Sequence, residues 1–150
     1  MAESPKFQVR VEGSIKSIDE RVWDSCAKGY SAFAESNCEA PESFSQALES
    51  TLEDGFPNPS NPFISHAFLA SLENSKSVGS RSGWLPQHLV VEDESGKIYG
   101  AAPCYLKAHS QGEYVFDHGW ADAYERAGGS YYPKLQVAVP FTPVPGPRLL

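Results

Sequence analysis

The sequence predicts an α/β domain of the α+β kind, with helices flanking a mostly antiparallel sheet. Short apolar or alternating runs at residues 7–11, 88–106 and 134–139 are typical of strands, and apolar residues at helical spacing lie between them at 18–26 and 61–72. The chain has 150 residues, of which 41% are hydrophobic, so it is long enough to bury a core of its own. The predicted order is strand, helix, helix, hairpin, strand, helix, strand.

The first strand and the first helix are indicated by two different periodicities. Residues Phe7–Val11 alternate between apolar and polar side chains, as a half-buried strand does. Ser17 and Glu20 have the spacing of a capping box, so a helix is expected to begin there, and Gly29 can end it. The apolar stripe of this helix consists of Ile18, Val22, Trp23 and Cys26.

The segment 34–60 is an acidic insertion. Between Ala34 and Asn61 it carries six acidic residues and no basic one, and we interpret it as a solvated segment that touches no ligand. Within it, the spacing of the apolar residues over 44–52 predicts a short surface helix. Asn61 and Pro62 then supply the N-cap and first residue of the most strongly indicated helix.

The second half of the chain is expected to supply most of the sheet. Residues 88–92 and 97–106 predict a β-hairpin, because a turn sequence separates two strand-like runs. Residues 113–117 are predicted to form a third strand, 120–127 a short helix that two glycines stop, and 134–139 a further strand.

Charge and cysteine usage exclude several classes of protein. The net charge is −7, and residues 1–75 hold 5 Lys and Arg against 12 Asp and Glu, whereas residues 76–150 hold 7 of each. A protein that binds a DNA backbone needs a stripe of cations, so DNA is not expected as a partner. No apolar run is long enough to span a membrane, and Met1–Pro5 lacks the start of a signal peptide. Three cysteines without paired spacing fit a cytoplasmic protein.

The residues between Tyr99 and Tyr132 are the best candidates for a site. Eight of the 18 aromatic residues fall there, interleaved with charged residues and histidines. This pattern fits a small-molecule cleft, but it equally fits a core sheet whose outward positions are polar. If 113–117 is a strand, Glu113 and Asp117 share one face, and the like charges raise the pKa of one carboxyl. Such a carboxylate is suited to accept a proton from an amine.

Two other chemistries have weaker support. The spacing of His109, Glu113 and His118 matches no known zinc-ligand signature, so no metal site is predicted. Cys104 lies in an apolar run after Pro103, where a buried, unreactive thiol is expected rather than a nucleophile.

Several blocks of the sequence resemble a known family. They lie, in the order in which the family has them, at 61–69, 83–89, 105–110, 112–117 and 131–143, among them Gly112-Glu113-Tyr114-Val115-Phe116-Asp117 and Tyr131-Tyr132-Pro133-Lys134. The sequence is similar in these blocks to the FemAB-like predicted N-acyltransferases, also called peptidoglycan biosynthesis/recognition proteins. The likeness covers about residues 61–150, and the acidic insertion lies outside it.

The resemblance implies a fold related to the GCN5-type N-acetyltransferases (GNAT) and transfer of an acyl or aminoacyl group to a small-molecule or peptide amine. On this basis we expect Asp117 and Glu113 to bind or deprotonate the amine as catalytic residues. The expected substrate-binding residues are Lys107, Lys134 and Arg148 for anionic groups, Trp120 and Tyr132 as walls, and His109 and His118 beside them.

The resemblance also implies that residues 1–150 form only the N-terminal lobe of a two-lobed enzyme whose C-terminal lobe is absent. No glycine-rich, pyrophosphate-binding turn before a helix is found, so we expect no cofactor to bind here, and acyl-CoA or aminoacyl-tRNA to be the donor of the complete enzyme. The chain alone is expected to be inactive and to self-associate through an exposed sheet edge. The alternative is a non-catalytic module that keeps an aromatic, amine-binding cleft.

Overall fold

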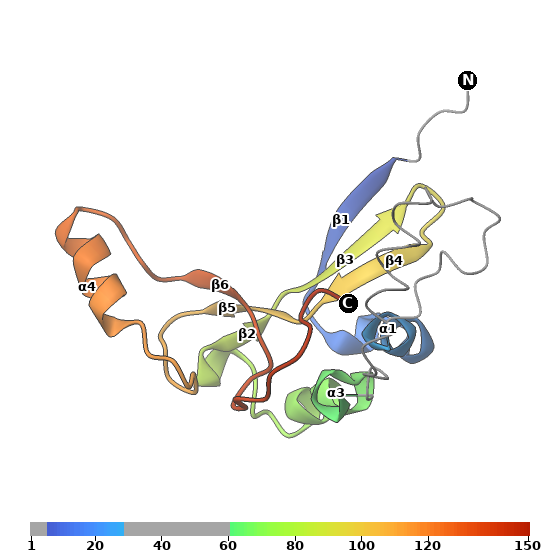
Figure 1. The fold of residues 1–150 in the computed structure, drawn as a ribbon, viewed down its shortest axis with the longest axis horizontal. Helices are drawn as coiled ribbons and strands as arrows, with labels where there is room; N and C mark the ends of the chain where they lie inside the picture. Colours follow the sequence, from blue (N-terminus) through green and yellow to red (C-terminus); the bar gives the residue numbers. More distant parts are fainter. Residues whose placement is uncertain (1–5, 29–60) are drawn as a thin grey trace, which may run out of the picture.

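The computed structural model describes residues 6–28 and 61–150, which form two small antiparallel sheets and three α-helices (Figure 1). The α+β class predicted from the sequence is therefore confirmed. The acidic insertion, its predicted surface helix and Gly29 lie outside the described residues. Within the described ranges, no helix is long and apolar enough to cross a membrane.

A long, bent, two-stranded ribbon contributes two neighbouring strands to each sheet. In one sheet β3 (His88–Asp93) pairs with β4 (Ile98–Ala102), and in the other β2 (Trp84–Pro86) pairs with β5 (Cys104–Lys107). The predicted hairpin is thus present, but Pro103, which has no N–H to donate, divides its second strand. The expectation of one sheet is replaced by two sheets joined at this bend.

Each half of the ribbon gains one outer strand. The strand β1 (Phe7–Glu12) pairs with β3, with Val9 opposite Val91, so the first sheet has the order β1-β3-β4. The strand β6 (Lys134–Val137) pairs with β5, so the second has the order β2-β5-β6. Both outer strands were predicted, although β6 ends two residues earlier than expected.

Helices α1 (Glu20–Ala27) and α3 (His66–Asn74) lie together at one end of the molecule, beside the first sheet (Figure 1). Asp19 begins α1 by accepting hydrogen bonds from the amides of Arg21 and Val22 at 2.9 and 3.1 Å. The predicted cap, Ser17, belongs instead to the short 3-10 turn η1 (Ile15–Ser17). A carboxylate at the N-cap satisfies the free amides at a helix start.

The second predicted helix was expected to begin at Pro62, but α3 begins at His66. Asn61 does cap a helical turn, but that turn is the 3-10 helix η3 (Pro62–Ile64), and Ser65 then caps α3. A further 3-10 turn, η4 (Ser80–Ser82), leads into β2. The main core cluster joins these helices to the first sheet and consists of Ile15, Ile18, Trp23, Leu69, Val90 and Ala101.

The chain between β5 and β6, residues 108–133, extends away from the helices as an arm that carries α4 (His118–Arg126) near its tip (Figure 1). The helix α4 confirms the predicted helix, shifted by two residues at its start. The strand predicted at 113–117 is wrong: these residues form turns and irregular backbone before α4. Gly112, at φ +80°, and the bond from the Glu113 amide to the Ser110 carbonyl at 3.2 Å turn the chain there.

Candidate functional site

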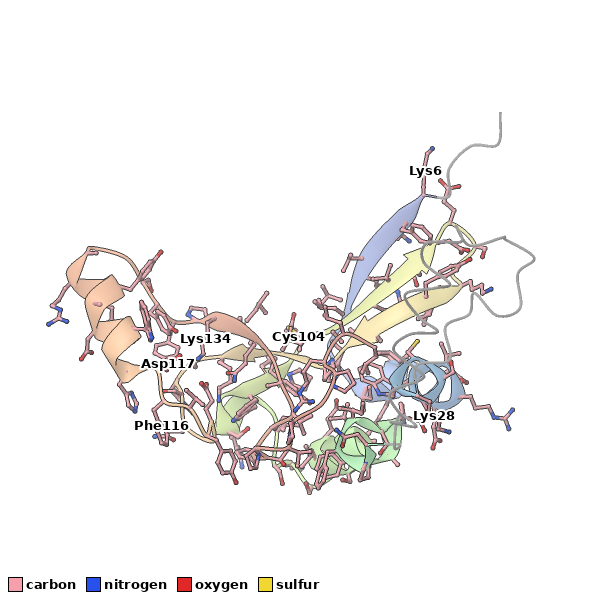
Figure 2. All side chains as sticks on the ribbon, in the orientation of Figure 1. Lys6, Lys28, Cys104, Phe116, Asp117 and Lys134 are labelled. Atoms are coloured by element: carbon pink, nitrogen blue, oxygen red, sulfur yellow. The ribbon has the colours of Figure 1, made fainter. Side chains whose placement is uncertain are left out.

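The base of the arm holds a group of charged side chains that we call the lysine–carboxylate cluster: Lys107, Glu113, Asp117 and Lys134. Lys134 lies at its centre, with its Nζ 2.9 Å from Glu113 Oε2 and hydrogen-bonded to Asp117 Oδ2. Figure 2 shows Lys134 and Asp117 next to each other, where β6 begins and the chain enters α4. The two carboxylates therefore share one ammonium, although the strand that was to bring them together is not formed.

Two tyrosine hydroxyls complete the coordination of Asp117. Tyr131 donates to Oδ2 and Tyr132 to Oδ1, both at 2.9 Å, and the Ser110 hydroxyl lies 3.0 Å from that of Tyr132. Partial burial alone would raise the pKa of Asp117, but the bonds from Lys134 and the two tyrosines outweigh it and hold this pKa well below its ordinary value. Asp117 is thus a stable anion and a weak base.

Lys134 is stabilised as a cation by the same contacts. Burial opposes its charge, but the hydrogen bonds to Asp117 and Glu113 raise its pKa above the ordinary value for lysine. Its Nζ also lies 5.7 and 5.8 Å from the ring centroids of Tyr131 and Tyr132, within the range of cation–π attraction. Two carboxylates and two aromatic rings therefore surround the primary ammonium of Lys134.

Lys107 is the second cation of the cluster, and its side chain is fully buried. Burial lowers its pKa to about 8, although Glu113, whose Oε1 lies 3.7 Å away, partly offsets this effect. The ammonium is 3.6 Å from the centre of the Trp84 ring and donates to the Gln111 carbonyl at 2.9 Å. The Trp84 indole donates to that same carbonyl at 3.1 Å. Two strand residues thereby fix the loop that presents Glu113.

Strand pairing places two lysines next to each other, and Glu113 neutralises the repulsion between them. Lys107 of β5 and Lys134 of β6 are directly opposite each other in the antiparallel register. Like charges at such a position repel one another and destabilise a sheet. Glu113 contacts one lysine with each of its oxygens, and its side chain is 4% exposed, so it neutralises a repulsion that water screens only weakly.

The remaining site residues predicted from the sequence lie outside the cluster. His109 accepts a hydrogen bond from the Gln111 amide at 3.2 Å, while His118 stacks on the Phe116 ring, with centroids 5.6 Å apart. Trp120 is 75% exposed on α4. Arg148 donates to the backbone carbonyls of Val144, Gly146 and Pro147. Of the nine predicted residues, the structure brings five together: Lys107, Glu113, Asp117, Tyr132 and Lys134.

Tyr131, Ser110 and Trp84 belong to the surroundings of the cluster and were not among the predicted site residues. Tyr131 adjoins Tyr132 in one of the family-like blocks. The two adjacent tyrosines before a predicted strand were the sequence feature from which Tyr131 could have been included in the site. The contact of Trp84 with Lys107 depends on the pairing of β2 with β5, for which the sequence offers no signal.

The described residues contain no group of three or more histidine, cysteine or carboxylate side chains placed to hold a metal ion. Cys104 is buried, as expected, and burial raises the pKa of its thiol. A second buried polar pair lies in the core, where His88 Nε2 is 3.2 Å from Glu73 Oε1. The Ser14 hydroxyl and the Ile15 amide also donate to Glu73, so this carboxylate ties the chain after β1 to α3.

Comparison with protein-family models identifies a family for the chain, whereas comparison with individual proteins does not. Neither the curated proteins nor the solved structures compared with the chain contain a match. The model of the FemAB-like family, described as peptidoglycan biosynthesis/recognition, matches residues 14–150. This range contains the whole lysine–carboxylate cluster and all but the start of the fold, so the chain belongs to the FemAB-like family of peptidoglycan biosynthesis and recognition proteins.

Proposed function

We propose that this chain serves in an N-acyltransferase that moves an acyl or aminoacyl group to an amine, in the cytoplasm and in the service of peptidoglycan synthesis. Glu113 and Asp117 bind the acceptor amine as its ammonium. One observation carries the proposal: these carboxylates, 4% and 13% exposed, already hold a primary ammonium beside two tyrosine rings. The family of the chain supports the connection with peptidoglycan.

The reaction we propose forms a C–N bond between the amine nitrogen and the carbonyl carbon of the donor. The bound ammonium first gives one proton to water, which frees the nitrogen lone pair. The C–S bond of an acyl-CoA or the C–O bond of an aminoacyl-tRNA then breaks, and the leaving thiolate or alkoxide takes up the second proton, which the amine loses as the C–N bond forms. Positioning the amine next to the donor carbonyl is a large part of such catalysis. Because the pKa of Asp117 is low, its role is to hold the amine rather than to deprotonate it.

A transfer assay on the complete enzyme, with labelled acyl-CoA and aminoacyl-tRNA donors and an amine acceptor, tests this function. Glu113→Gln and Asp117→Asn each remove one charge-assisted contact, so kcat/KM for the acceptor should fall about tenfold or more. Asp122→Asn is the matched control, because Asp122 is an exposed carboxylate on α4. Equal kcat/KM values for Asp117→Asn and Asp122→Asn would contradict the proposal.

The same site suits a second function, a non-catalytic module that binds an amine-bearing ligand. The weak basicity of Asp117 favours this alternative, since a binding module needs a stable anion and no proton transfer. The assay separates the two functions: a module binds the amine with the same dependence on Glu113 and Asp117, but it transfers no acyl group from either donor.

A further inference from the structure

The ammonium-binding site at the base of the arm is already filled by a side chain of the protein itself. Lys134 Nζ makes hydrogen bonds to both Glu113 and Asp117, and two tyrosine rings lie within 5.8 Å of it. An external ammonium with the same charge and the same hydrogen-bond donors would compete for the same oxygens. The site therefore has to be vacated before it can accept an acceptor amine.

The geometry allows such an exchange at constant charge. Lys134 is the most exposed member of its ion pairs, at 19%, against 4% for Glu113 and 13% for Asp117. A lysine side chain has a flexible four-carbon stem, so its ammonium can reach water while its backbone stays in β6. The carboxylates, in contrast, are held by Tyr131, Tyr132 and the turn at Gly112.

One acceptor atom within the cluster is still unused. Glu113 Oε1 is buried and makes no hydrogen bond in the described part of the chain, since Lys107 Nζ, at 3.7 Å, is beyond hydrogen-bond distance. A buried carboxylate oxygen without a donor costs free energy. An ammonium that also donated to this oxygen would gain a hydrogen bond that Lys134 does not make.

We propose that Lys134 acts as an internal occupant of the acceptor site and that an incoming primary ammonium displaces it from Glu113 and Asp117. This inference rests on the proposed function, because it assumes that the site receives an amine. The apparent affinity for an acceptor is then the intrinsic affinity multiplied by the fraction of time for which Lys134 leaves the site open. Its release from Asp117 also frees the start of α4 from β6.

The test uses n-butylammonium as the probe and n-butanol, which has a similar shape and no charge, as the control ligand. Lys134→Met keeps most of the stem of the side chain and removes the ammonium. Isothermal titration calorimetry should show n-butylammonium binding to this variant at least about tenfold more tightly than to the wild-type chain. Lys16→Met, at an exposed lysine of η1, should bind as the wild type does, and n-butanol should bind to none of them.

A second measurement uses the wild-type chain, so its result does not depend on whether a variant folds. In the wild-type chain, the side-chain ammonium resonance of Lys134 should shift towards that of a solvated lysine when n-butylammonium is added, while the resonance of Lys16 stays constant. A Lys134 resonance that is unmoved by bound probe overturns the proposal.

The possible failures are distinguishable. Equal affinity of the wild type and Lys134→Met for n-butylammonium, abolished by Glu113→Gln, overturns the displacement of Lys134 and leaves the amine site standing. Binding that neither carboxylate variant weakens, or no binding by any chain, overturns the proposed function and this inference together.

Discussion

Replacement of Asp117 by asparagine is the most direct perturbation of the lysine–carboxylate cluster. The variant keeps the shape of the side chain but removes its charge, and its amide group directs N–H donors at groups that are themselves donors. Asp117 accepts hydrogen bonds from Tyr131, Tyr132 and Lys134. Hydrogen bonds to charged groups contribute about 1.5–3 kcal/mol each, and the partial exposure of Lys134 reduces this value. We therefore expect Asp117→Asn to lower the free energy of unfolding of the arm by about 2 kcal/mol.

Urea denaturation followed by circular dichroism, together with amide hydrogen exchange of α4, measures this loss at pH 7. Asp122→Asn serves as the control and should change the free energy of unfolding by less than about 0.5 kcal/mol. In the double variant with Lys134→Met the effects should be strongly non-additive, because the two side chains contact each other. If Asp117→Asn exchanges and unfolds as Asp122→Asn does, the cluster does not hold the arm.

The dependence of this effect on pH follows from the direction of the pKa shift. The pKa of Asp117 is lower in the folded chain than in the unfolded one, so its contribution is complete above about pH 5, where an unfolded aspartate is almost fully ionised. The contribution is lost as the pH falls further, towards the folded-state pKa. The difference between the wild type and Asp117→Asn should therefore shrink in acid, and a difference that is constant down to pH 2 would contradict the assignment.

Three further predictions concern other parts of the fold. Carbon-13 NMR of the lysine side chains should show Lys107 titrating at about pH 8, and at a lower pH in Glu113→Gln; an ordinary value above 10 would show that it is not buried. Gly83→Ala should lose about 1–2 kcal/mol in urea denaturation, since φ is +70° and the new Cβ would meet the His109 ring, whereas Gly13→Ala should be neutral within about 0.5 kcal/mol. Trp23→Phe should lose about 2–4 kcal/mol in the same assay, because a cavity and an unpaired Ile64 carbonyl replace a buried indole; a loss under about 1 kcal/mol would be the contrary result.

Much of the fold follows from patterns that act over a few residues. The alternation of Phe7–Val11, the starts of α1 and α3, and the turn between β3 and β4 all depend on neighbours in the sequence. Each was predicted within a few residues, although the caps are Asp19 and Ser65 rather than Ser17 and Asn61. The division of the sheet was not predicted. It depends on Pro103, which interrupts a strand-like run: the part before it, β4, pairs with β3 in one sheet, and the part after it, β5, pairs with β2 and β6 in the other.

The candidate site also depends on contacts between residues far apart in the sequence, which local patterns do not predict. Glu113 and Asp117 were chosen because a strand would place them on one face, but these residues form no strand. They meet because a residue 17 positions after Asp117, Lys134, attracts both. A charge pair of this kind has no period in the sequence, so the alternation argument chose two residues that do lie together, but for a wrong geometric reason. Whether they are catalytic stays a prediction.

The contact that joins the start of α4 to β6 is made of charges that solvent partly reaches, and this makes the arm responsive to ionic strength. At about 1 M salt the Debye length falls to about 3 Å, so dissolved ions screen Asp117 and Lys134 far more than they screen the buried Lys107. The hydrophobic core beneath α1 and α3 gains from the same salt only if the anion is excluded from protein surfaces, as sulfate is. Sodium chloride and ammonium sulfate therefore both weaken the contact that holds α4, whereas only ammonium sulfate also stabilises the core beneath α1 and α3.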